Sequence, residues 1–197
     1  MTTAHASLPR PDRTNERILW TYVIAIAGFH LLALAALVPW LLTWTGLIAM
    51  VLGVHVFGQG INIGYHRLLA HRSFQTPRWV ERAFVLLAIC CFEDTPARWV
   101  ANHRYHHKYS DETPDPHSPL VSFLWSHVGW LLFRNPQLHH IGAYQRYVPD
   151  LIRDPFYFRL EKQPWLGPMV YTTHALLFTL GGFVFGWLTA SPGSDAL

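Results

Sequence analysis

Charged residues are scarce in this chain of 197 residues. Only 14% of its residues are Asp, Glu, Lys or Arg, and 51% are hydrophobic, whereas about a quarter of the residues in a soluble domain are usually charged. No charged residue occurs between Ile18 and Tyr65. Because a membrane-spanning helix needs about 20 consecutive apolar residues, this stretch is long enough for two spans. The composition therefore argues against an ordinary soluble domain.

Cysteine is also scarce, since the chain has only the adjacent Cys90 and Cys91. We expect small buried thiols at a reducing cytoplasmic face and no disulfide. The sequence has no haem or iron–sulfur motif, so any electrons that it uses must come from a separate partner. A net charge of +3 fits contact with an anionic lipid bilayer, and no feature indicates nucleic-acid binding.

The apolar stretches predict three membrane-spanning helices and an all-α, multi-pass fold. Two spans are expected at about 19–38 and 41–63, joined by a turn at Val38-Pro39-Trp40, since proline ends helices and tryptophan favours the interface. Arginines flank this hairpin on both sides, so the positive-inside rule puts both of its ends in the cytoplasm. The single domain, 1–197, is then divided into a cytoplasmic N-terminal tail, 1–18, a transmembrane hairpin, 19–63, a cytoplasmic helical metal-binding region, 64–162, and a third transmembrane helix, 165–188.

Histidines form two tight clusters after the hairpin, HRLLAH at 66–71 and HRYHH at 103–107. Imidazole is the commonest metal ligand and suits iron, zinc and copper. Five imidazoles without a cysteine exceed what one tetrahedral structural zinc uses. The pattern predicts a metal centre at the membrane surface with more than one metal ion. The candidate ligands are His66, His71, His103, His106 and His107.

The spacing within each cluster decides whether its histidines can converge. His103 is three and four residues from His106 and His107, so on a helix these side chains share one face. His66 and His71 are five residues apart, which is about 140° around an ideal α-helix. They meet only if the helix ends or loosens there, and Gly64 would permit that.

Three segments resemble the membrane acyl-CoA (stearoyl-type) fatty acid desaturases. GYHRLLAHRSF at 64–74 is similar to the first histidine box of that family. HRYHHKYSD at 103–111, followed by Asp115-Pro116-His117, is similar to the second box, and SHVGWLL at 126–132 is similar to a further family segment. The resemblance covers about residues 52–134.

The resemblance implies an oxidoreductase with a non-haem di-iron centre. Such an enzyme uses dioxygen as co-substrate and introduces a double bond into an acyl thioester, either an acyl-CoA or an acyl carrier. Electrons come from a separate ferredoxin- or cytochrome-type donor with its reductase, and the five histidines are the iron ligands. Trp99 either lines the acyl tunnel or anchors the protein at the interface. Arg134 either lies near the phosphates of the carrier or is an ordinary positive-inside residue. Asp115 and His117 either orient the imidazoles as outer partners or cap a loop.

The sequence departs from the family pattern at two places. Ala101 and Asn102 stand where animal-type members tend to carry Arg-Asp, which touches coenzyme A. A third box, His-x-x-His-His on a fourth spanning helix, is absent. We therefore expect a C-terminally truncated member of the family, and whether this polypeptide is active by itself is left undecided by the sequence. Two alternatives are a histidine-box hydroxylase of lipids or alkanes and a membrane remnant that has lost catalysis. The compact N-terminus favours a bacterial inner membrane.

Overall fold

Helices make up most of the described part of the chain. The computed structural model describes residues 17–39, 42–110 and 112–189, and within them it contains no β-strand. Three helices, Trp20–Leu37, Trp44–Ala70 and Leu166–Thr189, are long and apolar enough to cross a membrane. This confirms the predicted all-α fold class with three candidate spans. Residues 1–16 of the predicted tail and Trp40 of the predicted turn lie outside the described residues.

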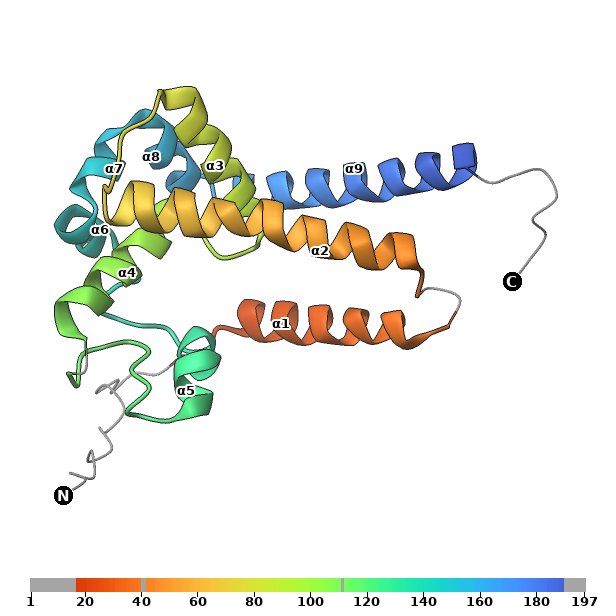
Figure 1. Ribbon diagram of the computed structural model, residues 1–197. Coiled ribbons are helices and arrows are strands. Elements are labelled where there is room, and N and C mark those ends of the chain that lie inside the picture. The colour runs from red at the N-terminus through yellow and green to blue at the C-terminus, as the bar shows by residue number, and fades with distance from the viewer. Residues whose placement is uncertain (1–16, 40–41, 111, 190–197) are drawn as a thin grey trace, which may run out of the picture.

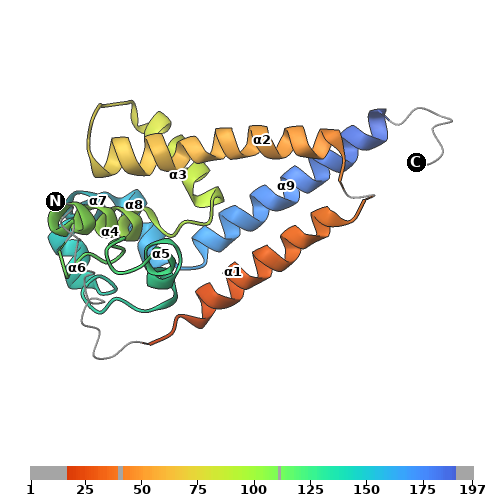
Figure 2. The ribbon, with the colours of Figure 1, turned by 60° about the horizontal axis from the view of Figure 1, so that its bottom comes forward.

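The three long helices project from one end of the molecule. α1 (Trp20–Ala33) continues into a short 3₁₀ helix (Leu34–Leu37), α2 (Trp44–Gln59) follows, and α9 (Leu166–Thr189) comes last. None of these elements contains a buried residue. The three helices leave the globular end on the same side of the molecule (Figures 1 and 2). Helices that are apolar on all sides suit a hydrocarbon environment.

The second long helix changes its winding before it ends. At Gly60, α2 passes directly into a π-helix, η2 (Gly60–Ala70), so the helix runs beyond the predicted end at residue 63 and carries His66. The amide of His71 donates to the carbonyl oxygen of His66 at 2.9 Å, which is the i→i+5 pairing of a π-helix. Residues five apart therefore lie above one another here.

Two glycines let α3 (Arg78–Cys90) pack against η2. A Cβ on Gly60 would lie 2.2 Å from the backbone nitrogen of Ala88, and a Cβ on Gly64 would lie 2.9 Å from the Cβ of Phe84. The two backbones are therefore in direct contact. Val85 is fully buried on the α3 side of this interface. Gly64 thus serves close packing in addition to the backbone freedom expected from the sequence.

The remaining helices form the globular end. α4 begins after Thr95, whose hydroxyl accepts from the amide of Arg98, with Pro96 in the first turn, as helix starts favour. Fully buried Val100 and Val148 lie in the shared core. The elements are α4 (Pro96–Tyr109), α5 (Phe123–His127), a 3₁₀ turn (Gly129–Leu132), α6 (Ile141–Tyr147), α7 (Pro149–Arg153) and α8 (Pro155–Lys162).

We predict that Gly60→Ala destabilises the protein, because its Cβ would overlap the backbone of α3. Overpacking of this kind typically costs about 1–3 kcal/mol. Gly53→Ala is the matched control, since a Cβ on Gly53 meets nothing within 4 Å and alanine favours a helix by about 1 kcal/mol. Thermal unfolding in detergent should show a lower midpoint for Gly60→Ala and an equal or higher one for Gly53→Ala. Equal midpoints for the two variants would contradict the close packing.

Candidate metal centre

Four of the five predicted ligands converge. His66, His71, His103 and His107 each place one ring nitrogen within 4.8 Å of the others. The Nε2 of His71 lies 3.0 Å from that of His66 and 3.1 Å from that of His103, and the Nε2 atoms of His107 and His103 are 3.0 Å apart. Nitrogen ligands at about 2.0–2.1 Å from one metal ion lie roughly 3.0–3.4 Å from each other. The spacing of the four nitrogens therefore fits a single shared ion. We call these residues the four-histidine group.

Two kinds of helix bring this group together. His103 and His107 are one α-helical turn apart on α4, so they share a face. His66 and His71 are one π-helical turn apart, and their ring centroids are 4.5 Å from each other. The five-residue spacing requires a helix that is wound more loosely than an α-helix, and the π-helix η2 provides this winding.

The electrostatics of the site favour neutral rings for His103 and His71. Burial, and then the neighbouring His107, His66 and His71, lower the pKa of His103 to about 3. The pKa of His71 is also lowered, by desolvation among the rings and then by His66 and His107. A metal ion binds the lone pair of a neutral imidazole. At neutral pH these two rings need lose no proton to become ligands.

His106 does not join the four-histidine group. Its Nδ1 lies 2.9 Å from Oδ1 of Asp115, and its ring stacks on that of His117 with centroids 4.2 Å apart. His106, Asp115 and His117 form a second group whose ligand atoms lie within 4.8 Å of one another. The structure thus divides the five predicted ligands into four and one, and brings both predicted outer partners to His106.

Trp99 lies against the four-histidine group. Its ring stacks on His103 with centroids 4.9 Å apart and an interplanar angle of 20°, and it lies 6.5 Å from the ring of His66. Its Nε1 donates to Oε2 of Glu93 at 3.2 Å. Trp99 is therefore positioned to restrict the rotation of a candidate ligand.

Arg134 lies beside the start of the first span. It is exposed, its amide donates to the carbonyl oxygen of Arg17 at 2.9 Å, and its guanidinium donates to the carbonyl oxygen of His139 at 3.4 Å. The two predicted roles of Arg134, near a carrier phosphate or as an ordinary positive-inside residue, stay predictions.

Arg104 connects the two histidine boxes, although it was not predicted as a site residue. Its guanidinium donates to the carbonyl oxygens of Leu69 at 2.7 Å and Ala70 at 3.2 Å, at the end of η2. It also donates to the carbonyl oxygen of Tyr147 and makes a two-pronged pair with Asp150 at 2.8 and 3.0 Å. The last carbonyls of a helix need such partners. The sequence does show an arginine inside a histidine box. It does not show the partners of this arginine, because they are distant in sequence.

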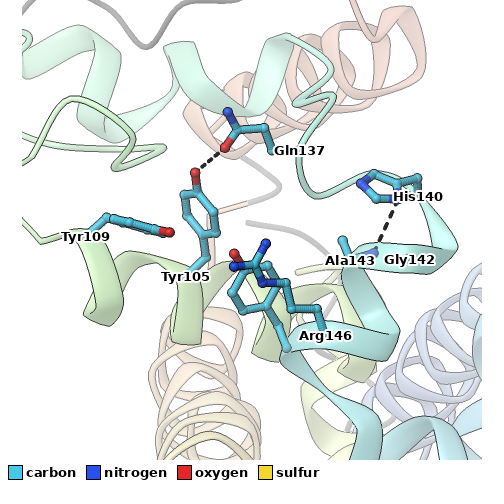
Figure 3. A pocket seen from close by; sticks show the side chains of 8 residues that line it. Tyr105, Tyr109, Gln137, His140, Gly142, Ala143 and Arg146 are labelled. Carbon is cyan, nitrogen blue, oxygen red and sulfur yellow. Dashed lines mark hydrogen bonds between the residues drawn. The ribbon is translucent and has the colours of Figure 1, made fainter.

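A separate pocket lies on another side of α4. It has a volume of about 480 Å³ and contains none of the predicted ligands. Tyr105 lies about 200° around the helix from His103, and its hydroxyl donates to Gln137 (Figure 3). His140 and Arg146 also line the pocket. The pocket and the four-histidine group therefore use different faces of one helix.

We predict that Asp150→Asn lowers the free energy of unfolding in a pH-dependent way. Burial alone would raise the pKa of Asp150, but hydrogen bonds from Arg104 and Arg72 outweigh it and lower the pKa to about 2. The stabilisation is therefore present above about pH 4 and is lost as the pH falls towards 2, and it amounts to roughly 2 kcal/mol at neutral pH.

Unfolding in detergent across this pH range measures the effect. The difference between wild type and Asp150→Asn should be full at neutral pH and shrink below about pH 4. Glu112→Gln, which neutralises an exposed carboxylate, is the control and should change little. A difference that does not vary with pH would contradict the proposed origin of the stabilisation.

Comparisons with known proteins identify a family to which this chain is similar. The family model "Fatty acid desaturase" matches residues 40–194. An sn-2 palmitoyl-lipid 9-desaturase of Nostoc sp. is 38% identical, over 93% of this chain and 64% of that protein. An sn-1 stearoyl-lipid 9-desaturase of Synechocystis sp. is 36% identical over 91% and 55%, and an acyl-CoA 5-desaturase of Anemone leveillei is 34% identical over 91% and 57%. This chain thus spans less than two thirds of the length of these relatives.

Proposed function

The chain belongs to the fatty acid desaturase family, and we propose that it introduces a double bond into an acyl chain with dioxygen at an iron centre. The observation that carries the proposal is the convergence of four imidazole nitrogens, from His66, His71, His103 and His107, at the end of a helix able to span a membrane. Membership of the family confirms the resemblance seen in the sequence.

The residues of the site fit iron as the metal. Four neutral nitrogen ligands hold an ion without the negative charge that carboxylates would add. Iron supplies, when bound, the oxidising power that an unactivated C–H bond requires and that no side chain provides. Contacts within the chain keep the candidate ligands in position. Trp99 stacks on His103, and Arg104 connects the end of η2 to α4. In a di-iron centre, His106 would belong to the second ion.

The site lies where an acyl chain can reach it. His66 stands on the continuation of the second span, so the centre is at the membrane end of the globular part. The arginines that follow the hairpin, Arg67, Arg72, Arg78 and Arg82, support a cytoplasmic position of this part by the positive-inside rule. The region 64–162 is then the cytoplasmic metal-binding part, between the hairpin and the third span, in a bacterial inner membrane.

An acyl chain on a glycerolipid is the favoured substrate. Two of the relatives are named for acyl-lipid substrates. Ala101 and Asn102 are both buried, and the Asn102 amide donates to the carbonyl oxygen of Arg98 on its own helix, so this position offers no cation to coenzyme A phosphates. A thioester substrate, with Arg134 near its phosphates, is the alternative. Electrons come from a separate ferredoxin- or cytochrome-type donor.

Expression in bacteria that lack other desaturases tests the proposal. With a ferredoxin and its reductase supplied, mass spectrometry should find new monounsaturated chains, in the lipid fraction for a glycerolipid substrate and in the thioester pool for the alternative. His103→Ala should lower product by about 100-fold or more, since even outer-shell changes cost 10–100-fold, and should lower the bound iron. His127→Ala, an exposed histidine whose ring bonds to its own helix, is the control.

Wild type that holds iron, receives electrons and still forms no unsaturated product would contradict the proposal. Hydroxylated chains in place of unsaturated ones would replace it with the hydroxylase alternative. Product that is unaffected by His103→Ala would contradict the assignment of the four-histidine group.

A further inference from the structure

The short helix α5 exposes two large apolar side chains on the globular end. Phe123 and Leu124 are each 70% exposed, whereas the next residue of the helix, Trp125, is only 2% exposed. Adjacent apolar side chains that are this exposed are typical of a surface that contacts a membrane or another protein. The pair therefore makes α5 a candidate contact surface.

The fold of α5 keeps this pair from turning inward. The indole of Trp125 donates to the carbonyl oxygen of Pro116 at 3.1 Å, so the side chain of Trp125 marks the inner face of the helix. Successive residues of a helix are about 100° apart, so Leu124 lies about 100° and Phe123 about 200° around the axis from that face. The exposure of Phe123 and Leu124 thus follows from the burial of Trp125.

Backbone pairing joins this part of the chain to the beginning of the first span. Ile18 forms an antiparallel bridge with Phe133, and the amide of Leu19 donates to the carbonyl oxygen of Leu132 at 2.8 Å. α5 accordingly lies beside the start of α1 (Figures 1 and 2). Because α1 is long and apolar enough to enter a membrane, the exposed pair lies at the level where the bilayer begins.

The charges around α5 suit a lipid surface. The chain has no acidic residue between Asp115 and Asp150, so the segment that contains α5 does not repel anionic headgroups. The exposed residues Arg17 and Arg134 flank the backbone bridge to the first span. Arginines at the level of the headgroups attract anionic lipids, and aromatic side chains favour the same interface.

We propose that α5 inserts Phe123 and Leu124 into the bilayer, as a contact separate from the three spans. A bilayer fits this surface better than a protein partner does, because the pair adjoins the start of α1, where Ile18 and Trp20 are also exposed. Segments that lie in the interface place phenylalanine and leucine among the lipid chains in this way. The inference goes beyond the proposed function, since it depends on neither the metal nor the reaction.

Nitroxide labels in a reconstituted bilayer test the contact. Phe123→Cys and Leu124→Cys are labelled in vesicles of phosphatidylethanolamine and phosphatidylglycerol, and the signal from wild type labelled at its own cysteines is subtracted. Oxygen concentrates among lipid chains, whereas a neutral nickel chelate stays in the water. Their relative effects on the power saturation of the spectrum therefore report the depth of each label. We expect oxygen to relax both labels more strongly than the chelate does.

Two further labelled variants provide the references. Leu177→Cys, at an exposed position of α9, gives the result expected within the membrane. Gln145→Cys, at an exposed position of α6, gives the result expected in water, because α6 lies on the side of the globular end away from the long helices (Figures 1 and 2). The labels at Phe123 and Leu124 should resemble the label at Leu177.

Two results would overturn the inference. Labels at Phe123 and Leu124 that the chelate relaxes as strongly as it relaxes the label at Gln145 would show that α5 lies in water. Immobilised labels that neither reagent reaches would show that protein covers α5. Either result would leave the proposed function intact, because that proposal is tested by the product and by the bound iron.

Discussion

The metal centre depends on one backbone hydrogen bond, from the amide of His71 to the carbonyl oxygen of His66 at 2.9 Å. In an α-helix the two side chains would point about 140° apart, and their rings could not meet. With i→i+5 pairing they lie on one face, with centroids 4.5 Å apart. The π-helix is rare and appears mostly as single turns within α-helices, frequently at functional sites. The surrounding structure must therefore stabilise this register.

Two contacts supply that stabilisation from opposite ends of η2. At the start, the absence of a side chain on Gly60 lets the backbone of α3 lie against the helix. At the end, the guanidinium of Arg104, on α4, donates hydrogen bonds to the carbonyl oxygens of Leu69 and Ala70. Asp150 holds that guanidinium in place. The helix that bears the first histidine box is thus fixed by the helix that bears the second.

The sequence predicts the parts of this design that follow from local rules. Three spans can be read from composition because a bilayer demands long apolar helices, and His103 and His107 share a face because they are four residues apart. For His66 and His71 the sequence predicts only that they meet if the helix ends or loosens there. It does not predict the π-helix, whose register depends on packing against α3. Arg104 was missed because its partner Asp150 lies 46 residues away. The sequence also does not predict the separation of His106 from the other four histidines, because it depends on the fold of the loop that contains Asp115.

That separation gives the two groups different chemistry although they share α4. His106 and His107 are adjacent, so their side chains leave the helix about 100° apart, yet their rings remain only 5.6 Å from each other. The four-histidine group consists of neutral nitrogen donors, whereas the second group includes a carboxylate. α4 therefore places imidazole nitrogens on one face and brings His106, on a neighbouring face, to the carboxylate of the loop residue Asp115.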